Sequence, residues 1–126
     1  MKEIVDKLVE IEKETSEEKG EYDFFALFLR ENSSDKWDIL VAANWIDNNK
    51  EEALKYLAKI FQNSFNQNEL LSISRIVLIE DTNPALPALQ QAINVEHGSI
   101  EIKDANFFGL EIKHAFLITS KNRQVA

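Results

Sequence analysis

The stretch YDFFALFLRENSSDKWDILVAANW, residues 22–45, contains two strongly apolar segments on either side of a short polar one. In residues 22–31 apolar side chains occupy both alternating faces, as expected of a strand that is covered on both sides. Residues 32–36 have the composition of a turn. Apolar residues alternate again over 37–45, and a connection of about five polar residues favours an antiparallel hairpin.

Three further segments have helical signals. Residues 2–18 place apolar side chains at helical spacing, which predicts an N-terminal amphipathic helix. Asn49, with Glu52 three positions later, predicts a capping box at the start of a second helix. Asn83 followed by Pro84 predicts the start of a third, because proline is well tolerated in the first turn.

The remaining apolar segments, residues 73–80, 99–104 and 110–119, are predicted strands. The element order is then α-β-β-α-β-α-β-β. At 126 residues the chain fits one domain. We therefore expect a single α+β (or α/β) domain over residues 1–126, with a mixed five-stranded sheet covered by three helices.

The tripeptide Glu-Ile-Lys occurs once in each of the last two predicted strands. A hairpin in which Lys103 lies opposite Glu111 also sets Glu101 opposite Lys113. The same register brings the two isoleucines together on the other face. Because opposite charges across a strand pair stabilise a sheet, this register explains both tripeptides as ordinary sheet surface.

The tripeptides also resemble the (Asp/Glu)-x-Lys motif of the restriction-endonuclease-like family. The resemblance implies Glu111 as a metal ligand, Lys113 as the group that orients the attacking water, and Asp81 as the upstream acid. Glu101 and Lys103 could take the same two roles.

Residues 27–43 resemble a second family, the nucleotidyltransferases, in which a strand opens with Asp-x-Asp. Aligned on that motif, Asp38 supplies the second carboxylate, but Lys36 stands where the first should be, and Arg30-Glu31 replaces the Gly-Ser turn. The resemblance implies a degenerate member without transferase activity. The simpler interpretation places Asp38 on the outward face of an edge-like strand.

Polar residues follow two strands that a helical crossover makes parallel neighbours. Ligands bind outside the carboxyl ends of such strands. Carboxylates there could bind a hard cation, or they could cap helices. The residues expected along this rim are Asn44, Trp45, Asp47, Glu80, Asp81 and Asn83. No cofactor is predicted, since the chain lacks a glycine-rich phosphate loop.

The composition narrows the function classes. A formal net charge of −8 disfavours nucleic acid, the absence of cysteine excludes sulfur-based zinc sites, and no apolar run is long enough for a membrane span. Trp45 and the Phe107-Phe108 pair are expected either to cover the core or to form a contact surface, and the first helix either packs on the sheet or forms a dimer.

These features favour a cytoplasmic protein-interaction or regulatory module without catalytic activity, acting through a protein partner or self-association. The alternative is a divalent-metal-dependent phosphodiester enzyme, either restriction-endonuclease-like or degenerate nucleotidyltransferase-like.

Overall fold

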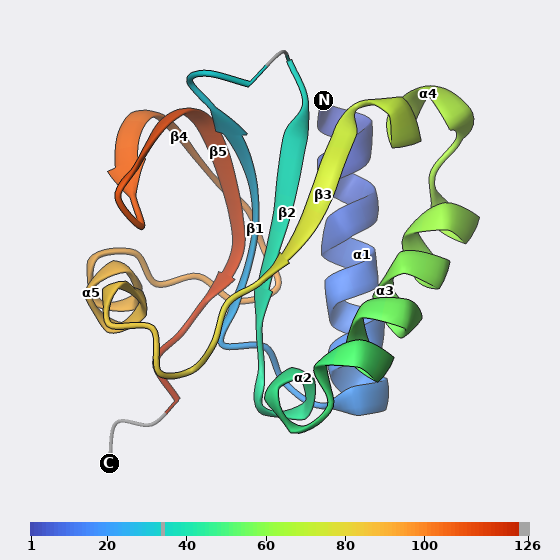
Figure 1. Ribbon diagram of the computed structural model, residues 1–126, viewed down its shortest axis with the longest axis horizontal. Helices are drawn as coiled ribbons and strands as arrows, with labels where there is room; N and C mark the ends of the chain where they lie inside the picture. Colours follow the sequence, from blue (N-terminus) through green and yellow to red (C-terminus); the bar gives the residue numbers. More distant parts are fainter. Residues whose placement is uncertain (34, 124–126) are drawn as a thin grey trace.

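The hairpin predicted from residues 22–45 forms the middle of the sheet in the computed structural model (Figure 1), which describes residues 1–33 and 35–123. Strand β1 (Phe24–Arg30) pairs antiparallel with β2 (Trp37–Ala42), and both are almost completely buried. Position 34, in the predicted turn, and positions 124–126, at the end of the predicted domain, lie outside the described residues.

The sheet has the order β3-β2-β1-β5-β4. β3 (Ile73–Leu78) is parallel to β2, whereas β4 (Ile100–Phe107) and β5 (Leu110–Ser120) form an antiparallel hairpin whose second strand pairs with β1. The predicted mixed five-stranded sheet in a single α+β domain is therefore confirmed.

The three predicted helices are present as α1 (Lys2–Lys19), α3 (Lys50–Ser64) and α5 (Ala85–Ala92). Two short helices were not predicted: α2 (Asn44–Asn48) and α4 (Gln67–Leu71). The predicted second strand ends at Ala42, so positions 44 and 45 belong to α2. Asn66 and Glu69 form the reciprocal bonds of a capping box, which accounts for the start of α4.

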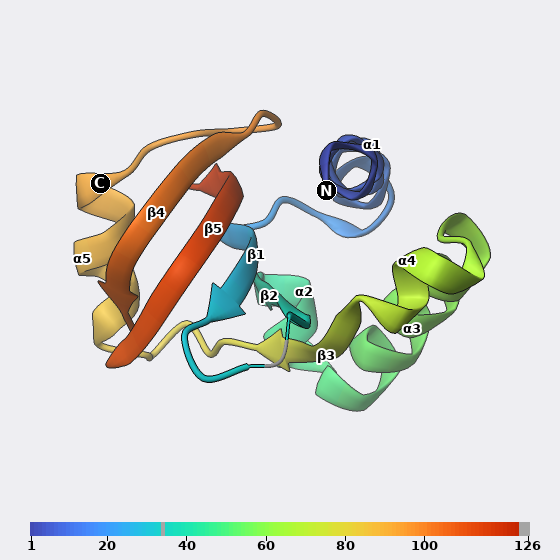
Figure 2. The same ribbon diagram turned by 90° about the horizontal axis from the view of Figure 1, so that it is seen from above.

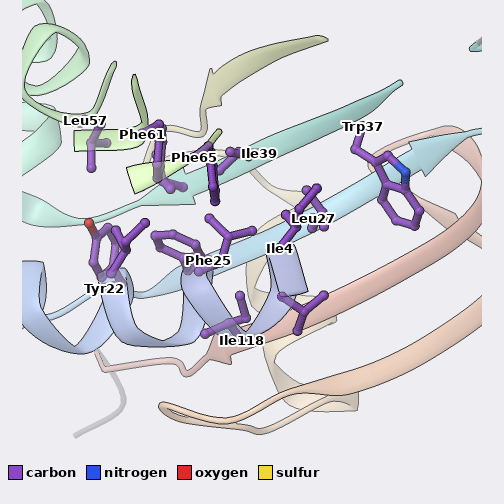
Figure 3. Packing of buried hydrophobic residues seen from close by; sticks show 14 of the residues in the cluster. Ile4, Tyr22, Phe25, Leu27, Trp37, Ile39, Leu57, Phe61, Phe65 and Ile118 are labelled. Carbon is purple, nitrogen blue, oxygen red and sulfur yellow. The ribbon is translucent and has the colours of Figure 1, made fainter. Parts of the chain in front are cut away.

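One face of the sheet packs against α1 and α3 (Figures 1 and 3). Figure 3 shows Phe25 and Leu27 of β1 pointing into the same layer as Phe61 of α3 and Ile4 of α1. The apolar stripe of α1 is buried on its own sheet, as one of the two sequence interpretations expected. This layer forms the larger of two apolar clusters in the core.

The other face packs against α5 and against the turn of the β4–β5 hairpin. The Phe107 and Phe28 rings stack at 5.5 Å between centroids, and Phe108 meets Phe24 edge-on at 5.8 Å. The two phenylalanines of the turn thus cover the core. In Figure 2, α5 lies beside β4 and β5, and the β3 end of the sheet is displaced from it.

The register predicted for the β4–β5 hairpin is wrong. Glu111 lies opposite Asn106, and Lys103 lies opposite His114. Phe108 and Gly109 have φ values of 54° and 74°, so they form a tight two-residue turn of the kind that closes hairpins. Instead of pairing with Lys113, the Glu101 carboxylate contacts His114 Nε2 at 2.6 Å.

Among the described residues, no helix is both long enough and apolar enough to cross a membrane.

Candidate functional site

The rim predicted at the carboxyl ends of β2 and β3 exists, because those strands are parallel neighbours. Asp47, in α2, accepts a hydrogen bond from the Asp81 backbone N–H at 3.2 Å through Oδ2. Its other oxygen, Oδ1, is buried and has no hydrogen-bond partner among the described residues. Two of the predicted acids therefore lie together, on segments that follow different strands.

Asp23 also belongs to this rim, although the sequence did not indicate it. Because β1 is antiparallel to β2, its start lies beside the end of β2, where the Asp23 N–H donates to the Ala42 carbonyl at 2.8 Å. The pKa of Asp23 is raised to about 7, mainly because the carboxyl is buried and also because it is hydrogen-bonded to Asp81 and lies near the negative charge of Asp81. Arg123 lowers this pKa by a smaller amount. The Asp23 carboxyl therefore releases its proton only as the pH approaches neutrality.

Arg123 lines one hollow of the rim together with Asp23 and Asp81. Its Nε donates to the Tyr22 carbonyl at 3.0 Å and lies 3.8 Å from Asp23 Oδ1. Its guanidinium also pairs with Glu96, which holds the pKa of that carboxyl below its usual range. Hollows of about 380 and 130 Å³ adjoin here, and both are lined by Asp23 and Arg123.

The other predicted rim residues have structural partners. Glu80 pairs with Lys50 at 2.6 Å, and Asn83 Oδ1 accepts the Ala85 N–H at 3.0 Å at the start of α5. The predicted cap at Asn83 is wrong, because Pro84 is the N-cap of α5 and the Asn83 side chain only closes a turn before it. The Trp45 indole N–H donates to the Gly20 carbonyl at 2.9 Å, so the ring lies against the core. Asn44 lines the larger hollow.

The rim does not have the geometry of a metal centre. Across residues 1–33 and 35–123, no group of three or more histidine or acidic side chains is arranged to hold a metal ion. The rim acids have other partners instead. Asp47 accepts the Asp81 backbone N–H, Glu80 pairs with Lys50, and Asp23 is hydrogen-bonded to Asp81.

The residues expected from the endonuclease resemblance are not brought together. Asp81 contacts Asp23, which precedes β1, whereas the Glu111 carbonyl accepts the N–H of Glu31, which follows β1. The seven residues of β1 separate these points by roughly 23 Å. Lys113 is exposed on β5. Asp81, Glu111 and Lys113 therefore do not form one site.

Asp38 differs from its prediction as well. It lies on an interior strand rather than an edge-like one, and it is only 3% exposed. Arg30 Nε lies 2.8 Å from its Oδ2, and Arg75 Nε lies 3.3 Å from its Oδ1. The carboxylate that the nucleotidyltransferase resemblance would assign to metal binding is thus neutralised by two guanidinium groups.

A second buried acid that the sequence did not indicate joins α1 to β5. Glu12 is completely buried, and its two oxygens contact Thr119 Oγ1 at 2.7 Å and His97 Nδ1 at 2.5 Å. The His97 N–H donates to the same threonine hydroxyl at 3.2 Å. The closed network fixes the loop before β4 against the first helix.

A different kind of site lies on the sheet face that α5 covers only in part. It is a groove of about 410 Å³, which we call the β3–hairpin groove. Val77, Leu78 and Ile79 are consecutive in its wall, and since side chains alternate between faces, the wall includes main-chain atoms of this segment. Phe108 and Leu110 form the opposite wall. The groove is lined by Leu40, Val77, Leu78, Ile79, Glu80, Thr82, Asn83, Pro84, Phe108 and Leu110.

Comparisons of this chain with family models, curated proteins and solved structures found no match.

Proposed function

We propose that this protein is a small protein-interaction module, and that the β3–hairpin groove is its contact surface. The observation that carries the proposal is the groove itself, which combines an apolar lining with the free edge of a strand. An extended segment of a partner can add to such an edge through main-chain hydrogen bonds and place alternate side chains in the adjoining groove.

The two edges of the sheet differ in a way that supports this choice. On β4, Asp104 has a φ of 53°, and Glu101, Lys103 and Asp104 are exposed, which are features that keep an edge from pairing. β3 has one charged residue, Arg75, and its last three residues are only partly buried. Its edge therefore has fewer protective charged residues than the edge of β4.

The exposure of single side chains agrees with a contact surface. Leu110, at the hairpin turn, is 40% exposed, and the neighbouring Phe108 and Val77 are only partly buried. Burying such side chains against a partner is favourable, at about 25 cal/mol per Å² of apolar surface. A regulatory protein of the cytoplasm without catalytic activity fits these features and the acidic composition.

The geometry does not favour the metal-dependent phosphodiester reaction, because Asp81 and Glu111, two residues that it would need, lie near opposite ends of β1. Calorimetry with Mg²⁺ and Mn²⁺ separates the two functions. A site-specific binding heat that disappears in Asp81→Asn would favour the enzyme over the interaction module.

Photo-crosslinking tests the proposed surface even though the partner is unidentified. A photoreactive amino acid at position 110 should give a discrete adduct in extracts of the source cells, and the same group at Leu71 should not. Leu71 is the matched control because it is an apolar residue that is 64% exposed on α4. Equal adducts at both positions, or an adduct that persists with Val77→Lys, would count against the groove.

A further inference from the structure

A second hollow adjoins the β3–hairpin groove and differs from it in charge. It measures about 290 Å³ and is lined by Arg30, Glu31, Asn32, Gly109, Leu110 and Glu111. Leu110 lines both hollows and so forms a wall between them. We call the second one the Glu31–Glu111 hollow.

The carboxylates of this hollow have no cation of their own. Glu31 and Glu111 are exposed, and neither has an ion-pair partner in the part of the chain that the structure describes. Arg30, the one base in the lining, has its Nε 2.8 Å from the buried Asp38. Arg75 shares the Asp38 carboxylate, so these three residues carry one net positive charge, and together with the two glutamates they leave one net negative charge next to the apolar groove.

The other charges near the groove are already paired. Glu80 binds Lys50, and Arg75 lies against Asp38 beside Arg30. The whole chain carries a net charge of −8, so a second copy would bring repulsion rather than compensation. Charge complementarity thus favours a different, basic protein over self-association.

We propose that the groove and the hollow together bind an extended, basic segment of a partner protein. One apolar side chain of the segment lies in the β3–hairpin groove, a lysine or arginine enters the Glu31–Glu111 hollow, and the segment's main chain pairs with the edge of β3. This inference rests on the proposed function and adds the chemistry of the partner to it.

The alternation of a strand fits this arrangement. Side chains on one face of an extended segment repeat every ~7 Å, so an apolar and a basic residue two positions apart can reach adjoining hollows. A segment with the repeat Val-Ser-Lys-Ser places valine and lysine two positions apart, and therefore on the same face. The lysine's long stem can pack along Leu110 while its ammonium group reaches the carboxylates.

The test is fluorescence anisotropy with three labelled peptides, which have the repeats Val-Ser-Lys-Ser, Val-Ser-Ser-Ser and Val-Ser-Glu-Ser. The lysine peptide should bind the wild-type protein about tenfold more tightly than the serine peptide, since two exposed ion pairs each contribute a small factor. The double variant Glu31→Lys/Glu111→Lys should abolish that preference. The matched control, Glu10→Lys/Glu17→Lys, changes net charge equally on the exposed side of α1 and should keep it.

The outcomes separate this inference from the proposed function. If the serine peptide binds wild type and Leu110→Asp weakens it, but lysine gives no advantage, the groove stands and the basic partner is wrong. If the α1 control loses as much affinity as the hollow variant, the preference comes from overall charge, and the inference is also wrong. Binding of none of the peptides, or a dimer in sedimentation that Val77→Lys dissociates, overturns it as well. Circular dichroism of each variant verifies the fold.

Discussion

The stability of this protein should fall as the pH rises from 5 to 8, because of Asp23. The pKa of this carboxyl is about 7 in the folded chain and 3.8 ordinarily, mainly because it is buried and hydrogen-bonded to Asp81. Between these two pKa values the folded state binds a proton that the unfolded state releases. The free energy of unfolding therefore falls as the proton concentration falls, that is, as the pH rises. The stabilisation is complete below pH 3.8 and is lost as pH rises through 7.

The magnitude follows from the two pKa values. One pKa unit corresponds to ~1.36 kcal/mol, so the free energy of unfolding should drop by roughly 2–3 kcal/mol between pH 5 and 8, within a total of roughly 4 kcal/mol. Glu69, Glu80 and Glu96 have lowered pKa values, and their contribution is lost only as the pH falls below their ordinary 4.5. The interval from pH 5 to 8 is therefore largely free of their effect.

Urea unfolding followed by tryptophan fluorescence measures this at several pH values. The unfolding free energy of wild type should fall by roughly 2–3 kcal/mol between pH 5 and 8. That of Asp23→Asn should not show this fall, because the amide cannot release a proton. Asp6→Asn, on the exposed side of α1, should differ from wild type by a nearly constant amount. If the Asp23→Asn difference is equally constant from pH 5 to 8, the raised pKa of Asp23 is refuted.

Three further substitutions test other parts of the structure by the same unfolding assay. Thr119→Val removes the hydroxyl that bonds to buried Glu12 and to the His97 N–H, so the free energy of unfolding should fall by about 1–3 kcal/mol. A fall of less than about 0.5 kcal/mol would contradict the network. Asn66→Ala removes the capping box of α4 and should cost about 1 kcal/mol, unlike Asn68→Ala within the same helix. Gly109→Ala should cost about 1 kcal/mol through its φ of 74° alone, because no atom lies within 4 Å of the added carbon; a neutral result would mean that the turn relaxes.

The strands and long helices could be predicted because their signals are local. The alternation in residues 22–31 reports burial on both faces, and Asn49 accepts the Glu52 N–H at the start of α3 as its position suggested. The rim at the ends of β2 and β3 followed from one further rule, that a helical crossover joins parallel strands. These inferences use neighbours in sequence or a fixed topology.

The hairpin register could not be predicted from charge pairing, because the larger energy lies elsewhere. Two cross-strand ion pairs contribute ~0.2–1 kcal/mol each, whereas burying one phenylalanine contributes ~1.5–3 kcal/mol. The observed turn places Phe107 and Phe108 over the core at the expense of the pairs expected for Lys103 and Glu111. The sequence prediction weighed the smaller effect.

The most informative parts of the site were also hidden from sequence reasoning. Asp23 meets Arg123 from a hundred positions away, and Glu12 meets Thr119 across a similar separation. No periodicity or motif connects such residues. The groove likewise depends on the hairpin turn approaching β3, which only the three-dimensional arrangement establishes.

Amide hydrogen exchange with and without the lysine–valine peptide tests the interaction surface most directly. Added main-chain hydrogen bonds should slow exchange in residues 76–79 of the wild-type protein, with a smaller effect in residues 107–111, and Leu110→Asp should remove both changes. Unchanged exchange at the β3 edge while the peptide is bound, or slowing confined to α1 or to residues 44–49, would contradict the claim that this protein binds its partner through the β3 edge and the adjoining groove.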